Sequence, residues 1–270
     1  MAPEPAARRN TRDHCGERMK NIPDAASLRA VCQPADLDIC LYRKLIIRRF
    51  SIYLTAFFLR AGLSANSVSV FKGILACAGA ALFAPGRPAY FIAGAFLLQL
   101  SFVLDACDGE VARFTGSSRT AGGEFLDKIG DAGSRGLFYG AWGWGVYNLN
   151  GDIRAVMAGT IMAGLWLVVR FCAVETLLES FSNHTGTPAG QDEQRSLAML
   201  FVRNSDRGRI EYLLSALWSP WMNMAAAAAA LSFFPVLFEV FFWSYCLLWI
   251  INTVRKVRSG FRISNFERPV

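Results

Sequence analysis

The chain has 270 residues, of which 53% are hydrophobic, and its mean hydropathy of +0.30 is too high for an ordinary soluble domain. The apolar residues fall in long blocks, which indicates membrane-spanning helices rather than one or two soluble domains. The formal net charge is +7, but the basic residues cluster beside hydrophobic segments. This placement favours anionic lipid headgroups or a phosphate-rich substrate as partners, and argues against nucleic acid.

The N-terminal part of the chain divides into two segments. Residues 1–35 are polar and lack the apolar stretch of a cleavable signal peptide, so we expect a flexible extension. Residues 36–62 read DLDICLYRKLIIRRFSIYLTAFFLRAG, with basic residues spread through an apolar background. This pattern predicts an amphipathic helix lying along the membrane interface, and the alternative is a simple basic segment beside the membrane.

Six apolar segments follow, each close to or above the roughly 20 residues that a membrane-spanning helix needs. They are Ser67–Phe83, Ala89–Val111, Gly123–Tyr147, Ile153–Phe181, Ile210–Leu231 and Phe234–Val254. The predicted fold is therefore an all-α integral membrane protein with six transmembrane helices, preceded by the amphipathic helix. Its membrane domain covers residues 63–256, and a basic cytoplasmic tail covers residues 257–270.

The distribution of lysine and arginine predicts the orientation in the membrane. The region up to Arg60 carries eleven of them, the polar linker over residues 182–209 four, and the tail from Arg255 five. The loops on the opposite side offer little beyond Arg87 and Arg154. The positive-inside rule then places both termini, the linker and the turn between the second and third spans in the cytoplasm.

That turn carries an acidic stretch, DACDGEVARFTGSSRTAGGEFLDKIGD. Asp105 and Asp108 are three residues apart, and Asp127 and Asp131 are four apart, so each pair shares one face of a helix. Two antiparallel helices would bring the pairs opposite one another. Converging carboxylates at membrane depth repel each other, and divalent cations relieve this cost. An all-carboxylate set suits Mg²⁺ or Mn²⁺, and two such ions would form a clamp for phosphoryl chemistry.

Small and basic residues among the aspartates suit a phosphate-bearing ligand. Gly109 and Ala112 keep their helix face shallow, and Arg113 offers a planar positive fork that matches phosphate. The alternative is an aspartate-lined polar pocket or a set of helix caps at a cytosolic turn. Four carboxylates on matched faces, with Gly and Arg between them, favour the ligand site.

The pattern Asp105-x2-Asp108-Gly109-x2-Ala112-Arg113, then Gly123-x3-Asp127-x3-Asp131, resembles the signature of the CDP-alcohol phosphotransferase family. Members of that family are six-helix membrane enzymes that move a phosphoalcohol from a CDP-linked donor to an acceptor hydroxyl and release CMP. The stretch LSANSVSV at the entry to the first span extends a weaker likeness. The loop between Arg113 and Gly123 is one residue longer than the usual pattern, which leaves its nucleotide contacts open; Gly122 is the other candidate for the motif glycine, but Gly123 keeps the spacing to Asp127.

The resemblance implies roles for the matched positions. Asp105, Asp108 and Asp127 would hold two Mg²⁺ or Mn²⁺ ions. Asp131 would be a further ligand and also the general base that takes the proton of the acceptor. The residues implied to line the CDP site are Gly109, Ala112, Arg113, Gly123 and Asn66. The family likeness is also the only basis for expecting a homodimer.

Charged residues inside the predicted spans are candidates for the acceptor pocket. They are Lys128, Arg135, Arg170, Glu175 and Glu179. Structural pairing near the cytoplasmic end is the equally weighted alternative for those of the fourth span. The linker arginines Arg203, Arg207 and Arg209 could bind a phosphorylated acceptor, although the positive-inside rule explains them better. Lys72, one turn into the first span, either reaches the nucleotide or snorkels to the interface.

The leading functional hypothesis is a membrane transferase that uses a CDP-linked alcohol or lipid as donor and a hydroxyl compound as acceptor, in phospholipid biosynthesis. The same chemistry could instead make a non-glycerolipid or soluble phosphodiester. A divalent-cation transporter is the hypothesis from a different class. It predicts acidic residues spread near the middle of the membrane, whereas here they cluster at one face beside Gly and Arg.

Overall fold

The computed structural model describes residues 25–33, 42–116, 121–183 and 221–266. These residues form α-helices and one π-helical turn, and the described ranges contain no strand, which confirms the all-α prediction. The elements are α2 (Ala25–Cys32), η2 (Arg43–Ile47), α3 (Arg48–Arg60), α4 (Ala65–Ala81), α5 (Pro88–Thr115), α6 (Ala121–Asn150), α7 (Ile153–Asn183), α10 (Trp221–Leu231) and α11 (Pro235–Phe266).

Local sequence explains where these helices begin and end. The Ser64 side chain caps α4 by accepting a hydrogen bond from the backbone N–H of Ser67 at 3.2 Å. Pro88 occupies the first turn of α5, where a missing N–H costs nothing. The helix ends at Gly116, whose φ of 65° is left-handed and suits glycine. Gly86, in the break before α5, also needs its freedom, because φ is 70° and a Cβ there would lie 2.6 Å from a carbonyl oxygen of α6.

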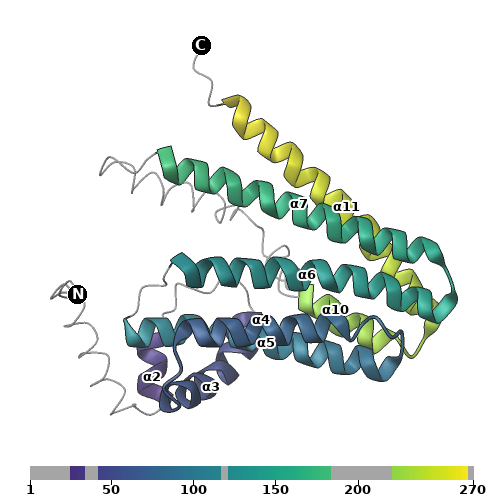
Figure 1. Cartoon of the computed structure of the whole chain (residues 1–270). Helices are drawn as coiled ribbons and strands as arrows, with labels where there is room; N and C mark the ends of the chain where they lie inside the picture. Colours follow the sequence, from purple (N-terminus) through teal and green to yellow (C-terminus); the bar gives the residue numbers. More distant parts are fainter. Residues whose placement is uncertain (1–24, 34–41, 117–120, 184–220, 267–270) are drawn as a thin grey trace, which may run out of the picture.

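The long helices form a bundle in which α4 packs between α5 and α6. Helix α6 also packs on α7, and α10 packs on α5 and α11. The short connections α4–α5, α6–α7 and α10–α11 lie at one end of this bundle (Figure 1). The end of α5, the beginning of α6 and the helices α2 and α3 lie at the other end (Figure 1). The bundle thus brings the acidic stretch of the sequence together with its N-terminal helices.

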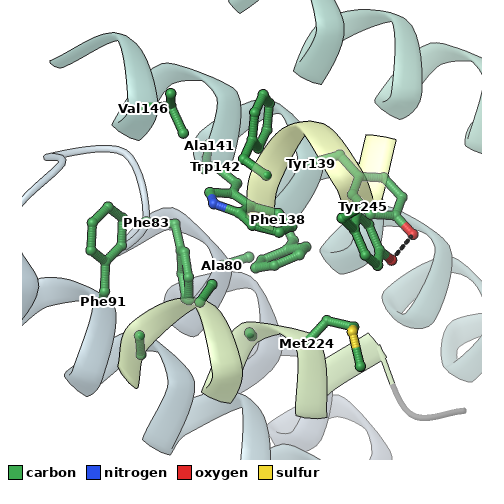
Figure 2. Close-up of a cluster of buried hydrophobic side chains, with 14 of the residues drawn as sticks. Ala80, Phe83, Phe91, Phe138, Tyr139, Ala141, Trp142, Val146, Met224 and Tyr245 are labelled. Carbon is green, nitrogen blue, oxygen red and sulfur yellow. Dashed lines mark hydrogen bonds between the residues drawn. The ribbon is translucent and has the colours of Figure 1, made fainter. Parts of the chain in front are cut away.

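The larger hydrophobic core fills the middle of the bundle with aromatic rings. Trp142 is fully buried, and its ring centroid lies 5.3 Å from that of Phe138 and 5.2 Å from that of Phe242. Figure 2 shows Trp142 and Phe138 beside the Tyr139–Tyr245 pair, whose hydroxyl oxygens are 3.3 Å apart. Such rings bury large areas and pack in offset or edge-to-face contacts, so this cluster fixes the relative positions of α6 and α11.

A smaller core joins α2 and α3 to the bundle. Leu28 on α2 and Ile52 on α3 are fully buried, and they belong to one cluster with Leu104 and Val111 on α5. Helices α2 and α3 both contact α5. The N-terminal helices are therefore packed against the last turns of α5 rather than lying apart from the bundle.

Glycines let the helix backbones approach closely. A Cβ at Gly143 on α6 would lie 2.4 Å from the carbonyl oxygen of Ala155 on α7. A Cβ at Gly130 on α6 would lie 3.5 Å from the Cα of Gly73 on α4. Small residues at helix contacts are typical of packing in membranes, where close van der Waals contact replaces the hydrophobic effect.

Among the described residues, α5 is the helix that is both long and apolar enough to cross a membrane. Shorter apolar stretches cover Ala65–Ala81, Ile153–Val168 and Pro235–Ile251. The first eleven residues of the expected fifth span, residues 210–220, lie outside the described ranges, as do residues 1–24 and most of the 182–209 linker. The count of six spans therefore stays a prediction.

The segment expected to be an amphipathic helix contains η2 and α3, and residues 36–41 lie outside the described ranges. On α3 the side chains of Phe50, Tyr53 and Phe57 are more than 60% exposed, whereas Ser51 and Thr55 are fully buried. One row of aromatic side chains on this helix thus points away from the protein, while Ile52, Phe58 and Leu59 are buried on the other side. Such an exposed row suits the expected position along a membrane interface, which also stays a prediction.

Candidate active site

Two helices bring three of the four predicted aspartates together. Asp105 and Asp108 lie one turn apart near the end of α5, and Asp127 lies in the second turn of α6. Each of the three offers a carboxylate oxygen, and these oxygens all lie within 4.8 Å of one another. Asp108 is fully buried, and the other two are half-buried. The 3.6-residue period that paired Asp105 with Asp108 in the sequence places both on the face of α5 that meets α4, where Lys72 and Ser69 lie.

A lysine from α4 lies at the centre of this carboxylate cluster. The Lys72 Nζ atom is 2.9 Å from Asp105 Oδ1 and 3.7 Å from Asp108 Oδ2, and it donates a hydrogen bond to Asp127. Ser69, one turn earlier on the same helix, donates to Asp108 Oδ2 at 2.8 Å. Buried like charges repel, so the single ammonium group offsets part of the repulsion among the three carboxylates. The sequence suggested that Lys72 reaches the nucleotide or snorkels to the membrane interface. In the structure it forms ion pairs with the aspartates inside the bundle.

The cluster has the chemistry of a site for a hard divalent cation. Its donors are carboxylate oxygens from three residues, with no histidine or thiolate among them, and they already surround one positive group. Mg²⁺ and Mn²⁺ prefer such oxygen ligands. Asp105, Asp108 and Asp127 could therefore hold a metal ion in the place where Lys72 now supplies the positive charge.

A second cation reaches the cluster from the N-terminal part of the chain. Arg43 in η2 donates a hydrogen bond to Asp105, and its guanidinium carbon lies 5.4 Å from the centre of the Phe102 ring. The preceding residue, Tyr42, donates to Gln99 Oε1 at 2.7 Å, which ties η2 to the middle of α5. Asp105 is thus shared between Lys72 and Arg43. The sequence placed Arg43 only among the basic residues of a juxtamembrane segment.

Asp131 lies apart from the carboxylate cluster and is surrounded by arginines instead. Its oxygens are 3.8 Å from Arg135 Nη2 and 4.0 Å from Arg170 Nη2. The Arg135 guanidinium lies over the Trp166 ring, 4.3 Å from its centre, in a cation–π contact. The structure therefore brings together three residues that the sequence assigned to the base and the acceptor pocket.

The other candidates for the acceptor pocket are less defined. Lys128 follows Asp127 on α6 and is half-buried. Glu175 and Glu179 lie on α7, at positions whose side chains are not among those described. Arg203, Arg207 and Arg209 fall outside the described residues altogether. Their assignment to the acceptor stays a prediction.

The residues expected at the CDP site are distributed around the same end of the bundle. Arg113 reaches toward α2: its Nε atom donates a hydrogen bond to the backbone oxygen of Cys32 at 2.6 Å. The open face of Gly109 is covered by that guanidinium, because a Cβ there would lie 3.2 Å from Arg113 Nη1. Asn66 lies in the first turn of α4, and Gly123 in the first turn of α6. Part of the unusually long loop, residues 117–120, lies outside the described ranges.

Two features of this site had only weak signals in the sequence. Ser69 and Lys72 are three residues apart in an otherwise apolar span, and this spacing places both on one helix face. Gly73 and Gly130 bring α4 and α6 close together directly beside them. Ser69 and Lys72 beside Gly73 could have indicated that this span contacts another helix, but the sequence did not say which helix.

Comparison with known proteins agrees with this geometry. A family model described as CDP-alcohol phosphatidyltransferase matches residues 62–241, which are 180 of the 270 residues and include all four aspartates. A comparison with curated proteins gave no match. The matched region covers α4 to the first turns of α11 and begins just after α3. The chain belongs to the CDP-alcohol phosphatidyltransferase family.

Proposed function

We propose that this protein is a membrane-embedded transferase that moves a phosphoalcohol or phosphatidyl group from a CDP-linked donor to an acceptor hydroxyl. A bond forms between the acceptor oxygen and the phosphorus atom of the transferred group, the phosphorus–oxygen bond to CMP breaks, and CMP leaves. Phospholipid biosynthesis is the process that best fits an active site at the membrane surface. The observation that carries this proposal is the convergence of three signature carboxylates from α5 and α6 around one positive group.

In this proposal Asp105, Asp108 and Asp127 hold Mg²⁺ or Mn²⁺, with two ions as the expected number. Bound there, the metal supplies positive charge that offsets the charge of the diphosphate and of departing CMP. Ser69 holds one oxygen of Asp108 through its hydroxyl group and so limits the ways in which that carboxylate can turn. Lys72 and Arg43 bring two further positive charges to the Asp105 side, which suits a diphosphate.

Asp131 takes the proton of the acceptor hydroxyl. Its side chain is 37% exposed and stands outside the carboxylate cluster, so one of its oxygens is accessible to an incoming hydroxyl group. Arg135 and Arg170 lie beside it and are the residues that we assign to orienting the acceptor. Whether Asp131 also serves as a fourth metal ligand remains a prediction from the signature.

Gly109, Ala112, Arg113, Gly123 and Asn66 are proposed to line the CDP site. In the described structure the Arg113 guanidinium lies over Gly109, and its Nε atom donates a hydrogen bond to α2. We propose that Arg113 forms the wall of the nucleotide site on the side of α2. We further propose a multi-pass arrangement with the carboxylate end of the bundle and both termini facing the cytoplasm, in line with the distribution of basic residues.

The test is release of CMP. Purified protein is incubated with Mg²⁺ and a panel of donors, CDP-diacylglycerol and CDP-linked headgroups, each with a panel of hydroxyl acceptors. We expect CMP from at least one pair, dependent on Mg²⁺ and lost in Asp108→Asn. Asp152→Asn is the matched control, because Asp152 lies in the α6–α7 connection at the opposite end of the bundle (Figure 1).

Two results would contradict the proposal. One is a folded protein that releases no CMP from any pair. The other is CMP release that Asp108→Asn leaves intact. Movement of Mn²⁺ across liposome membranes without CMP release would instead support the transporter hypothesis, which the family match disfavours.

A further inference from the structure

The side of α5 that faces away from the carboxylate cluster carries a second buried carboxylate, that of Glu110. This residue is 1% exposed. Its Oε1 atom accepts hydrogen bonds from Gln33 Nε2 at 2.7 Å and from Ser51 Oγ at 2.6 Å, and its Oε2 atom accepts one from Thr55 Oγ1 at 2.6 Å. All three donors are neutral, and all three come from the N-terminal part of the chain. A buried carboxylate with this many donors is satisfied without a cation.

Further bonds join the same stretch of α5 to the N-terminal helices. The Arg113 Nε atom donates to the backbone oxygen of Cys32 at 2.6 Å, and the Cys107 Sγ atom donates to the backbone oxygen of Ser51 at 3.4 Å. Gln33 also donates to the backbone oxygen of Arg48 at 3.0 Å, which links the end of α2 to the start of α3. Burial raises the pKa of the Cys32 thiol to about 11, so it stays neutral beside this network. Helices α2 and α3 thus hold α5 through a set of specific polar bonds.

The position of this network relative to the carboxylate cluster follows from helix geometry. Glu110 is two residues after Asp108, and two residues turn an α-helix by about 200°, so the side chains leave opposite sides of α5. Asp108 meets Lys72 and Ser69 of α4 on one side, and Glu110 meets α3 on the other. A rotation or shift of α5 would therefore disturb both sides together, because the helix is a rigid element.

We propose that α2 and α3 form a positioning element of the active site, with Glu110 as the residue through which they set the rotation and depth of α5, and thereby the places of Asp105 and Asp108. These two helices, Ala25–Cys32 and Arg48–Arg60, precede the family match, which begins at residue 62. The inference rests on the proposed function, because it assumes that the carboxylate cluster holds the metal. Glu110 touches neither the metal nor the substrate, so its effect is exerted entirely through the helix.

Four variants separate this positioning role from a purely structural one. Thr55→Val removes the donor to Glu110 Oε2 while keeping the shape of the side chain. Glu110→Ala removes the carboxylate itself. Glu110→Gln is the conservative variant, because its amide oxygen can face Gln33 and Ser51 while its NH₂ group donates to the Thr55 hydroxyl. Ser232→Ala is the matched control, since it deletes another buried hydroxyl group, at the α10–α11 connection.

Metal binding is measured directly on the full-length protein in detergent, by titrating Mn²⁺ and following the free ion by electron paramagnetic resonance. We expect Thr55→Val and Glu110→Ala to weaken Mn²⁺ binding by about tenfold, the range seen when residues that orient metal ligands are changed. The Mn²⁺ affinity of Glu110→Gln should stay within about threefold of that of the wild-type protein, and the affinity of Ser232→Ala should equal the wild-type value. In activity assays the half-saturating Mg²⁺ concentration should rise in the first two variants, while kcat at saturating Mg²⁺ recovers.

The outcomes distinguish failure of this inference from failure of the proposed function. If Thr55→Val and Glu110→Ala lower thermal stability but bind Mn²⁺ normally, α2 and α3 only stabilise the fold and the inference is overturned. If either variant does not fold, the other carries the test. Asp108→Asn is titrated in parallel: normal Mn²⁺ binding in that variant would show that the carboxylate cluster is not the metal site, which overturns the proposed function together with this inference.

Discussion

The two sides of the last turns of α5 hold buried carboxylates in opposite ways. Asp108 is 0% exposed and Glu110 is 1% exposed, and they are two residues apart. Asp108 lies beside other carboxylates and depends on the Lys72 ammonium group for charge balance. Glu110 lies alone among neutral hydroxyl and amide donors. Burial by itself therefore does not tell whether a carboxylate in this protein belongs to the chemistry or to the scaffold.

The two carboxylates differ in whether a metal ion could replace the group that now balances or binds them. One positive group can replace another beside Asp108, because the carboxylate oxygens are held close together and the ammonium group belongs to a flexible side chain. The donors to Glu110 are short side chains on α3 and at the end of α2, and they cannot leave without undocking those helices. The Asp108 side of α5 is therefore suited to binding metal and substrate, and the Glu110 side to fixing the position of the helix.

The largest effect should come from Asp131 on α6, the proposed base, which lies outside the carboxylate cluster. Asp131→Asn keeps the shape of the side chain but removes its capacity to accept a proton, so we expect kcat to fall by about 10²–10⁴-fold. Binding of the CDP-linked donor, measured by equilibrium dialysis with a non-reacting analogue, should change little. Retained turnover in this variant would remove the assignment of Asp131 as the base.

The next largest effect is expected for Lys72→Met, which tests whether the cation beside Asp108 can be exchanged. It removes the ammonium group that the three carboxylates share and leaves Arg43 paired with Asp105. Since two of the carboxylates are partly exposed, we expect a loss of about 2 kcal/mol in unfolding free energy in the presence of EDTA. Added Mg²⁺ should reduce this deficit, because a bound divalent ion takes over the charge balance and stabilises the folded state. Thermal unfolding with and without Mg²⁺ gives the measurement, with Arg154→Met as the control. A deficit that Mg²⁺ leaves unchanged would mean that the partner of Asp108 is not exchangeable.

On the fixed side, Thr55→Val should lower the free energy of unfolding by about 1–2 kcal/mol, the usual cost of leaving a buried acceptor without its donor. Here Mg²⁺ should not restore stability, because the lost partner of Glu110 is a neutral hydroxyl donor and not a cation that Mg²⁺ could replace. The same thermal unfolding experiment measures it, with Ser232→Ala alongside. If Mg²⁺ rescued Thr55→Val as well as Lys72→Met, the two sides of α5 would not differ in the way described.

The smallest effect is expected for Asp152→Asn at the far end of the bundle. Asp152 accepts from Arg154 Nε at 2.8 and 3.0 Å, but the Arg154 side chain is 78% exposed, and such surface pairs add little stability. We expect the melting temperature and the release of CMP to match the unchanged protein. A clear loss of either would mean that this connection affects the bundle in a way that its contacts do not indicate.

Spacing along one helix made part of this arrangement predictable from the sequence. Asp105 and Asp108 had to share a face if the segment was helical, and the second pair had the same property, so a carboxylate site between two helices followed. The partners of those carboxylates were not predictable in the same way. Lys72 meets Asp105 and Asp127, which are 33 and 55 residues away in the chain, and only the packing of α4 between α5 and α6 brings them together.

The N-terminal helices were harder still to interpret from the sequence. Basic residues spread through an apolar background predicted a helix at the membrane surface, and the exposed Phe50 and Tyr53 are compatible with it. The same pattern gave no sign that Ser51 and Thr55, which read as ordinary polar residues, turn inward to meet Glu110. The buried polar face of α3 could be recognised only once Glu110 on α5 was known to accept its hydrogen bonds.

The docking of α3 on α5 has a practical consequence for anyone who shortens this protein. A chain that started at residue 62 would keep the whole family match and every aspartate of the signature. It would also strip Glu110 of its three donors and Arg113 of the Cys32 carbonyl group. The smallest fragment worth producing therefore starts ahead of Ala25, and a domain boundary drawn by family likeness alone would cut through the support of the very helix that defines the family.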